Sequence, residues 1–428
     1  MTMRNYSPLF LFIFLLIVGC KKEINRFPAN QDADEDIVSQ TVSHGSVTTV
    51  DGVVTENTCT TVTLKSGEIY EICKPALWNG DLIIYAHGYV SVVEPLALPT
   101  EAAAYVPLFT ALGFAFATTS YSENGLAIQT GIDNILDLKK KFIKEFGEPN
   151  TIYLAGASEG GLVTTLAIER NPSSFDGGLP LCGPCVDFQR QINYYGDFRV
   201  LFDYFFPGVL PGNVINIPDE LIANWQTVYV PQVLAAIGAN PTNTIKLLNT
   251  AQAAYVPGDG NTINATVVGV LQYDVLATRD AIDKLKGQPY DNSTRMYSGT
   301  GSPQEDAQLN QNVQRYTGDK KALSVIEKDY QTSGIISVPL VGAHTTGDPI
   351  IPFWHLPLYA AKTVAQGTSS LFTGIPVARY GHCTFTEAEI VASFALLVLQ
   401  VQGLALTRTE KLITLSRSTK GKIVQSVQ

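Results

Sequence analysis

The 428-residue chain lacks features that would mark several protein classes. Its 29 lysines and arginines are outnumbered by 39 aspartates and glutamates, and no basic stripe is present to neutralise phosphates, which argues against a nucleic-acid partner. Histidine is scarce, with five residues, and there is no His-x-x-x-His pair and no phosphate-cradling loop, so we expect no metal and no cofactor. The content of 45% hydrophobic and 16% charged residues is that of a globular protein.

The chain also lacks an apolar run long enough to span a bilayer. Residues 8–18 are apolar but number only eleven, which suits the hydrophobic part of a signal peptide, with Arg4 as its positive start. The run leads into Ile-Val-Gly-Cys at residues 17–20, which resembles the bacterial lipobox, where the chain is cut before a cysteine that then carries lipid. We therefore predict a signal peptide over residues 1–19 and lipidation at Cys20; the alternative is an ordinary secretory signal with an incidental cysteine.

The segment that follows Cys20 is polar and acidic and shows no apolar periodicity. We predict that residues 20–45 form a disordered, lipidated tether. The signal peptide, the lipobox-like sequence and the tether together predict an exported bacterial lipoprotein attached to the outer membrane, on its periplasmic side or at the cell surface. The lipid on Cys20 would be its contact with the membrane.

Hydrophobic patterning predicts an α/β fold. Residues 46–73 alternate and are rich in valine and threonine, which is typical of antiparallel strands. Continuous apolar runs at 82–86, 114–119 and 151–157 are typical of strands buried on both faces, and apolar residues at helical spacing separate the last two. Strands that alternate with helices indicate a mostly parallel sheet with helices on both faces.

The second half of the predicted sheet is interrupted. Further strands are expected at 175–183, 338–344 and 375–381. The segment between the first two of these strands, residues 187–336, has a helical pattern and is too long for a loop. This insertion opens with a cluster of aromatic residues. They line a pocket for an apolar substrate group, or they form the core of the insertion. The cluster comprises Tyr194, Tyr195, Phe198, Phe202, Tyr204, Phe205 and Phe206.

The sequence GASEGG (156–161) contains the pattern Gly-x-Ser-x-Gly between a predicted buried strand and a predicted helix. In that context, the small residues Gly156 and Gly160 allow a sharp turn that exposes a serine hydroxyl above the sheet. We therefore predict Ser158 as a nucleophile; the alternative is a serine in a tight turn.

A nucleophilic serine needs a base and an acid that orients it. His382 follows the last predicted strand directly, and we prefer it to His344 and His355 on placement. Asp348 follows the strand at 338–344, where catalytic groups of parallel sheets gather. The chain order Ser158, Asp348, His382 is the order of α/β-hydrolases.

The developing oxyanion requires two backbone donors. We predict the amide of Glu159, the residue after the nucleophile, as one donor. Gly88 lies in the loop after the strand at 82–86 and lets the backbone turn, so we predict the amide of Tyr89 as the other donor.

The motifs YAHGY (85–89), GASEGG, HTTGDPIIP (344–352) and YGHC (380–383) occur in the order of the α/β-hydrolase superfamily. Over about residues 68–402 the chain resembles this superfamily, and most of all secreted bacterial esterases and lipases with a helical cap after the sixth strand. The resemblance implies a core at 46–186 and 337–405, a cap at 187–336 and a tail at 406–428. It also implies a serine hydrolase that cleaves small or lipidic carboxylic esters, without cofactor.

Two other functions are consistent with the same residues. A serine peptidase of the prolyl or aminopeptidase type shares this fold and triad, and it would need a polar anchor for an amine, for which Glu159 and Asp187 are candidates. The other possible function is that of a non-catalytic surface-binding lipoprotein on the same scaffold.

Six cysteines are present, and five remain besides Cys20. Cys59 and Cys73 flank a predicted hairpin and are candidates for a disulfide, which export permits. Cys383 beside the histidine resembles tannase-like and feruloyl-esterase-like hydrolases, where that cysteine bonds one before the nucleophile. Ala157 occupies that place here, so Cys182 and Cys185 are the alternative partners.

Overall fold

The computed structural model describes residues 38–50 and 53–404. The predicted signal peptide, the lipidation site Cys20 and the predicted tail at 406–428 lie outside the described residues. Within the described residues, no helix has both the length and the hydropathy that a membrane crossing requires.

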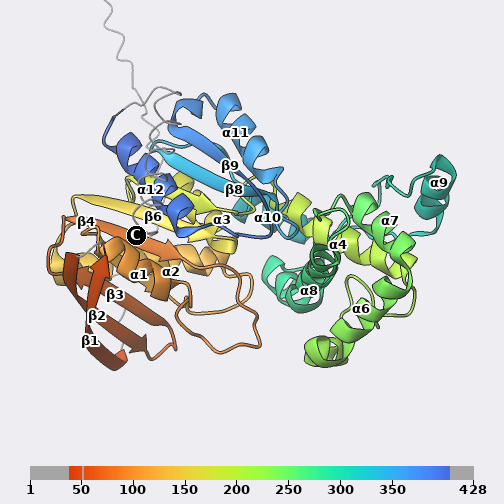
Figure 1. The fold of residues 1–428 in the computed structure, drawn as a ribbon, viewed down its shortest axis with the longest axis horizontal. Helices are drawn as coiled ribbons and strands as arrows, with labels where there is room; N and C mark the ends of the chain where they lie inside the picture. Colours follow the sequence, from red (N-terminus) through yellow and green to blue (C-terminus); the bar gives the residue numbers. More distant parts are fainter. Residues whose placement is uncertain (1–37, 51–52, 405–428) are drawn as a thin grey trace, which may run out of the picture. The chain divides into compact units, whose positions relative to one another are not determined.

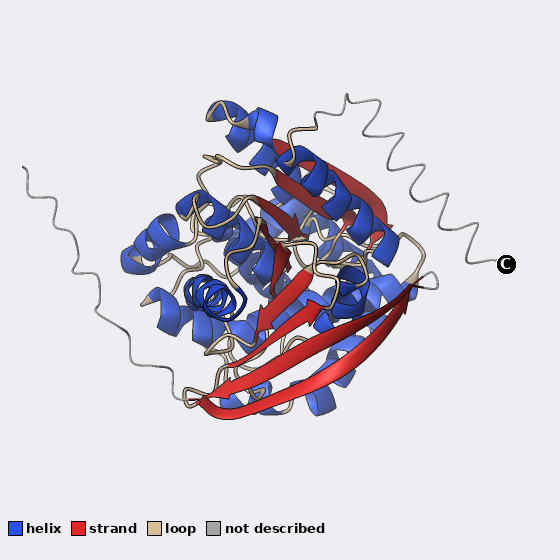
Figure 2. Ribbon diagram, turned by 90° about the vertical axis from the view of Figure 1, so that its left-hand side faces the viewer, coloured by secondary structure: helices blue, strands red, loops and turns tan. Residues whose placement is uncertain are grey.

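One nine-stranded sheet runs through the described part of the chain, in the order β1-β2-β3-β5-β4-β6-β7-β8-β9. Figures 1 and 2 show this sheet with helices packed around it. The strands from β4 to β9 pair in parallel, and β1, β2 and β3 extend the sheet in antiparallel fashion. The strands are β1 (Val38–Val50), β2 (Val53–Leu64), β3 (Ile69–Pro75), β4 (Asp81–Ala86), β5 (Ala115–Thr119), β6 (Thr151–Ala157), β7 (Gly177–Leu181), β8 (Leu340–Gly347) and β9 (Phe372–Tyr380).

Successive residues of the central strands point to opposite faces, and each face has a core of its own. Along β4, Ile84 packs with the helices α2 (Ile128–Phe146), α3 (Glu159–Arg170) and α11 (His355–Ala365). Its neighbour Tyr85 packs on the other face with α1 (Ala102–Thr110) and α12 (Glu387–Val401). Because both faces are covered, the strands are apolar throughout, as the continuous runs in the sequence predicted.

The first strand begins earlier than expected. Residues 38–45, which we predicted as the end of a disordered tether, belong to β1 and pair with β2, for example Thr41 with Val62. Side chains 40–45 are exposed, so this part of the edge strand forms backbone hydrogen bonds without an apolar pattern that the sequence could reveal. The predicted boundary at residue 45 is therefore wrong.

A helical insertion separates β7 from β8, which is after the sixth strand if β1 is not counted. It has its own apolar core. Two hydrogen bonds join it to the loop after β8: the Tyr194 hydroxyl donates to Pro349 O at 2.6 Å and Gln191 Nε2 donates to Ile350 O at 3.0 Å. The insertion comprises α4 (Phe188–Phe205), α5 (Asp219–Ala223), the π-helix η1 (Trp225–Tyr229), α6 (Val230–Ala239), α7 (Pro241–Ala251), α8 (Gly260–Leu285), α9 (Pro303–Asn312) and α10 (Lys320–Asp329).

These features confirm the predicted fold class. The sheet is mostly parallel with antiparallel strands at its N-terminal side, helices cover both faces, and a helical segment is inserted late in the chain. This is the α/β-hydrolase fold, and its catalytic groups are expected at the carboxyl ends of the parallel strands.

Candidate active site

Ser158 lies at the sharp turn between β6 and α3. Its backbone has φ 57° and ψ −123°, a conformation that costs a non-glycine residue about 1–3 kcal/mol. A Cβ on Gly156 would lie 2.2 Å from the Gly160 carbonyl oxygen, and one on Gly160 would lie 2.1 Å from that of Ala86. The two glycines therefore allow the close packing that holds the serine in its strained position.

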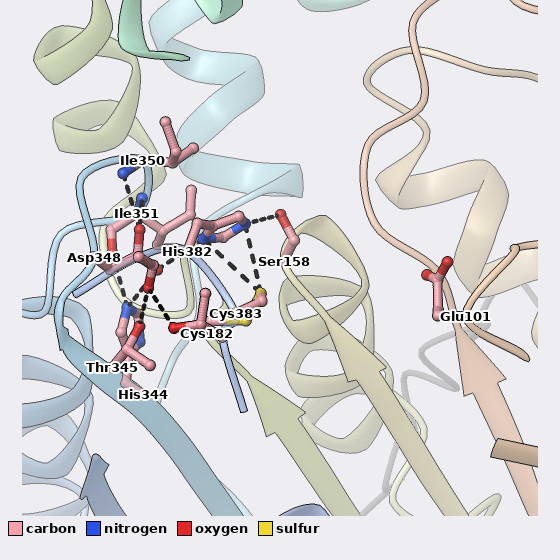
Figure 3. Close-up of a disulfide and its surroundings, with 12 residues drawn as sticks. Glu101, Ser158, Cys182, His344, Thr345, Asp348, Ile350, Ile351, His382 and Cys383 are labelled. Atoms are coloured by element: carbon pink, nitrogen blue, oxygen red, sulfur yellow. Dashed lines mark hydrogen bonds and ion pairs between the residues drawn. A yellow bond between two sulfur atoms is a disulfide. The ribbon is translucent and has the colours of Figure 1, made fainter. Parts of the chain in front are cut away.

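The structure brings the three predicted catalytic side chains together from separate loops (Figure 3). His382 Nε2 lies 2.8 Å from Ser158 Oγ, and His382 Nδ1 lies 2.7 Å from Asp348 Oδ2. His382 follows β9, and Asp348 follows β8, as the sequence predicted. An imidazole with this pair of neighbours can accept the serine proton at Nε2 while the carboxylate holds Nδ1–H.

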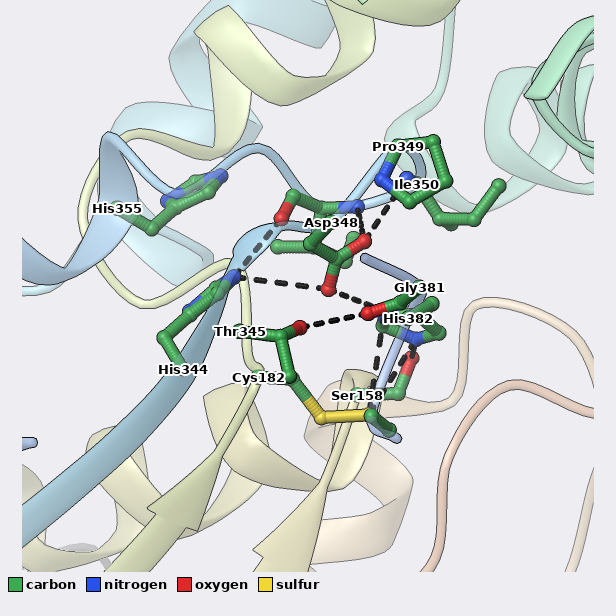
Figure 4. Close-up of polar contacts among 12 residues, drawn as sticks. Ser158, Cys182, His344, Thr345, Asp348, Pro349, Ile350, His355, Gly381 and His382 are labelled. Carbon is green, nitrogen blue, oxygen red and sulfur yellow. Dashed lines mark hydrogen bonds and ion pairs between the residues drawn. A yellow bond between two sulfur atoms is a disulfide. The ribbon is translucent and has the colours of Figure 1, made fainter. Parts of the chain in front are cut away.

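Hydrogen bonds hold both Asp348 and the loop that carries His382 in place. Its Oδ1 accepts hydrogen bonds from the amides of Ile350 and Ile351, each at 2.9 Å, and its side chain is fully buried. Thr345 Oγ1 donates to Gly381 O at 2.6 Å and ties the loop that carries His382 to β8 (Figure 4). The acid and the base are thus held by backbone contacts that do not depend on a substrate.

The other two late histidines have different contacts (Figure 4). His344 Nε2 lies 2.8 Å from the Ile351 carbonyl oxygen, and burial lowers the pKa of this ring. His355 Nε2 lies 2.9 Å from Gln191 Oε1, and burial lowers its pKa well below the usual value. Burial therefore favours the neutral form of both rings. His344 Nε2 also lies 3.6 Å from Asp348 Oδ2, whereas it is His382 that contacts the serine.

The loop after β4 runs directly against the nucleophile. A Cβ added to Gly88 would lie 3.1 Å from Ser158 Cβ, and Tyr89 lines the same cavity as Ser158. Glu159 is the first residue of α3, where amides are free of helical partners. The amides of Tyr89 and Glu159 are in this region, and their role as oxyanion donors stays a prediction.

Two disulfides lie within the described residues. Cys59 pairs with Cys73 across β2 and β3, as predicted. Of the two alternatives for Cys383, the structure forms Cys182–Cys383, which joins the end of β7 to the residue after His382. Cys185 is free, and burial raises the pKa of its thiol to about 12. In the part of the chain that is described, the one cluster with metal-ligand types contains this bonded pair of sulfurs and His382, so it offers no thiolate.

We expect loss of the Cys182–Cys383 bridge to impair catalysis as well as stability. The double variant Cys182→Ala/Cys383→Ala should lower the free energy of unfolding by about 2–5 kcal/mol, since a long loop is freed. It should also lower kcat about tenfold or more, because a displacement of His382 by about 1 Å misaligns the proton transfer. Denaturant unfolding and ester turnover measure the two effects.

The matched control for this prediction is Cys59→Ala/Cys73→Ala, which removes the disulfide that is remote from His382. It should lose stability and keep kcat. Wild-type kcat in the Cys182→Ala/Cys383→Ala variant would show that the bridge does not position the histidine.

Ser158 opens into a mostly apolar cavity between the sheet and the insertion. Of the seven clustered aromatic residues, Tyr195 lines this cavity, whereas Phe198, Phe202 and four others pack in or against the insertion's core. Most of the aromatic cluster therefore forms the core of the insertion and does not line a substrate pocket. Side chains from distant segments complete the cavity, and they include Tyr89, Phe188, Val214, Tyr273, Ala277 and Ile351.

The cavity contains one acidic side chain next to the nucleophile. Glu159 is buried, and its Oε1 accepts a hydrogen bond from the Ala127 amide at 2.9 Å. Burial raises the pKa of this carboxyl to about 8. The other predicted anchor, Asp187, caps α4 by accepting the Arg190 amide at 3.0 Å and does not line the cavity.

Comparison with known proteins gives matches at the level of structure only. No family model matches the chain, and no curated protein matches it. Feruloyl esterase B from Aspergillus oryzae aligns over 84% of this chain and 82% of its own, with a TM-score of 0.47 and 14% identity. The rice cell wall degrading esterase LipA from Xanthomonas oryzae aligns over 87% and 99%, with a TM-score of 0.43 and 12% identity. Candida antarctica lipase A in its closed state aligns over 88% and 85%, with a TM-score of 0.44 and 14% identity.

Proposed function

We propose that the protein is a serine hydrolase that cleaves carboxylic esters through an acyl-enzyme on Ser158. The observation that carries the proposal is the continuous hydrogen-bonded relay from Ser158 Oγ through His382 to the buried Asp348, with contacts of 2.8 and 2.7 Å. A relay of this geometry on a strained turn above a parallel sheet is suited to nucleophilic attack on a carbonyl carbon.

The chemistry proceeds in two steps. His382 Nε2 takes the proton as Ser158 Oγ bonds to the ester carbon, and the same proton passes to the departing alcohol as the ester C–O bond breaks. Water then loses a proton to His382 and attacks the acyl-enzyme, which releases the acid and returns the proton to Ser158. The amides of Tyr89 and Glu159 are our candidates to hold the oxyanion, and such a donor is worth about 2.7–4 kcal/mol.

The apolar lining of the cavity supports an ester with an apolar acyl or alcohol part. The peptidase reading keeps one supporting observation, because the Glu159 carboxyl stands in the cavity beside Ser158, where an amine anchor would be required. The two reactions share every catalytic step, so they differ only in the bond that is cleaved.

The proposal is tested by incubating the purified protein with a fluorophosphonate probe and with p-nitrophenyl esters from acetate to palmitate. We expect labelling of Ser158 and ester turnover, with the preferred chain length set by the cavity. Turnover of aminoacyl or prolyl amides without ester turnover would support the peptidase instead. Absence of both labelling and turnover would support the non-catalytic reading.

We also propose that the protein is an exported lipoprotein attached to the outer membrane through lipid on Cys20, on the basis of the sequence at residues 4–20. We expect Cys20→Ala to move the protein from the membrane fraction to the soluble fraction, because the anchoring acyl chains are lost. Fractionation followed by immunoblotting measures this. An unchanged distribution would contradict the anchor.

A further inference from the structure

The Glu159 carboxyl has an unused hydrogen-bonding position beside the nucleophile. The residue is 8% exposed and lines the cavity, and its Oε1 accepts the Ala127 amide at 2.9 Å. Over residues 38–50 and 53–404, no donor is in hydrogen-bond contact with Oε2, and no cation forms an ion pair with this carboxyl. A buried carboxylate with one oxygen free of donors is costly unless it takes up a proton, which its pKa of about 8 allows near neutral pH, or a ligand supplies a donor or a positive charge.

Lys284, the cation whose charge favours ionised Glu159, cannot supply that charge in full. Lys284 Nζ lies 3.4 Å from Asp280 Oδ1 and 3.4 Å from Glu123 Oε2, so its charge is shared between two other carboxylates. Asp280, Glu123 and Glu159 together therefore carry more negative charge than Lys284 can neutralise when all are ionised.

The insertion adds a second acidic side chain to the cavity wall. Asp274 lines the cavity and pairs with Arg199 at 3.1 Å, but Arg199 also pairs with Asp203 at 3.0 Å. The single positive charge of Arg199 is therefore also shared between two carboxylates. A cleft with an excess of one sign of charge concentrates ligands of the opposite sign.

Aromatic rings form the wall around this charge. The ring of Tyr273 lies 5.1 Å from that of Tyr195, nearly parallel at 6°, and 5.7 Å from that of Tyr89. All three residues line the cavity with Glu159. Ring faces attract cations, and most strongly in sites that exclude water.

We propose that this cavity takes a substrate group that carries a positively charged nitrogen, a substituted ammonium, which pairs with Glu159 and contacts the faces of Tyr89, Tyr195 and Tyr273. This inference rests on the proposed ester hydrolysis and names its substrate class. The cation belongs to the acyl part or to the alcohol part of the ester. Both parts meet at Ser158, which precedes Glu159 directly.

Two matched ester pairs test the inference on the purified protein. The members of each pair differ at one atom, which is a positively charged nitrogen in one ester and a neutral carbon in the other. Butyrylcholine against 3,3-dimethylbutyl butyrate places the charge in the alcohol. The methyl ester of 4-(trimethylammonio)butyrate against methyl 5,5-dimethylhexanoate places it in the acyl group. Acid release is followed by titration at about pH 8.5, where more than half of the Glu159 carboxyl is ionised, since its pKa is about 8.

We expect the wild-type kcat/KM, divided by the alkaline hydrolysis rate of each ester to correct for its intrinsic reactivity, to favour the cationic member of one pair by about tenfold or more, which is the effect of one modest ionic contact. In Glu159→Gln this corrected ratio should fall to about 1, and because it is a ratio within one variant, it is independent of any change in the shared oxyanion site. Glu145→Gln is the matched control: it removes the same charge from an exposed residue of α2 that does not line the cavity, and the ratio should be kept.

A wild-type preference for the neutral member of both pairs would overturn the inference and leave ester hydrolysis intact, as would an equal fall of the ratio in Glu145→Gln and Glu159→Gln. The wild-type comparison decides even if Glu159→Gln does not fold. Failure of the proposed function has a different signature, namely turnover of all four esters that is unchanged in Ser158→Ala.

Discussion

Replacement of Ser158 by alanine is expected to lower kcat for p-nitrophenyl butyrate by roughly 10⁴- to 10⁶-fold, with little change in KM. The hydroxyl is the atom that bonds to the substrate carbon, and the described neighbours of His382 offer no second hydroxyl at hydrogen-bond distance from Nε2. The small rate that persists would come from the oxyanion donors and from substrate binding.

The variant should fold normally, because Ser158 Oγ has one side-chain contact, to His382. Circular dichroism and the thermal midpoint check this. The matched control is Ser173→Ala, an exposed serine beyond the end of α3, which should keep wild-type turnover. Turnover that survives in Ser158→Ala would show that GASEGG is only a turn and that the nucleophile lies elsewhere.

Replacement of Asp348 by asparagine is expected to lower kcat by about 10³- to 10⁴-fold. The reason is that the two oxygens of the carboxylate have different hydrogen-bond partners. Oδ1 accepts two backbone amides, of Ile350 and Ile351, so the asparagine carbonyl must stay there and its NH₂ must face His382 Nδ1. Nδ1 then has to accept a hydrogen bond, the ring proton moves to Nε2, and Nε2 can no longer take the proton from Ser158.

The measurement is kcat and KM for the same ester over a range of pH, because a tautomer effect lowers kcat and leaves substrate binding almost unchanged. Asp187→Asn is the matched control, since Asp187 is also a loop aspartate but caps α4 outside the cavity. It should keep kcat within about threefold. An Asp348→Asn enzyme with kcat within tenfold of wild type would contradict the assigned orientation of His382.

Local sequence was sufficient for most of the fold and for the three side chains of the relay. The strand 151–157 was predicted with its observed bounds because it is a mostly apolar run that ends at Ala157, directly before the turn at Ser158, where periodicity and chain direction change together. Ser158, Asp348 and His382 could be selected because each follows a buried strand, and the ends of parallel strands converge on one edge of the sheet. The start of β1 was missed because an exposed edge strand needs backbone pairing and no apolar pattern.

The sequence by itself therefore determined the sheet, the sharp turn at Ser158 and the order of the relay, since these depend on periodicity, on glycine and on position relative to strands. Only the tertiary structure decided the partner of Cys383 and the use of the aromatic residues. It also decided the surroundings of Glu159. The disulfide depends on the ends of β7 and β9 lying side by side, at a sequence separation of 201. The cavity depends on which side chains meet across α4, α8 and the loop after β4. Such contacts are set by how the insertion packs on the sheet, and no local pattern in the chain records that packing.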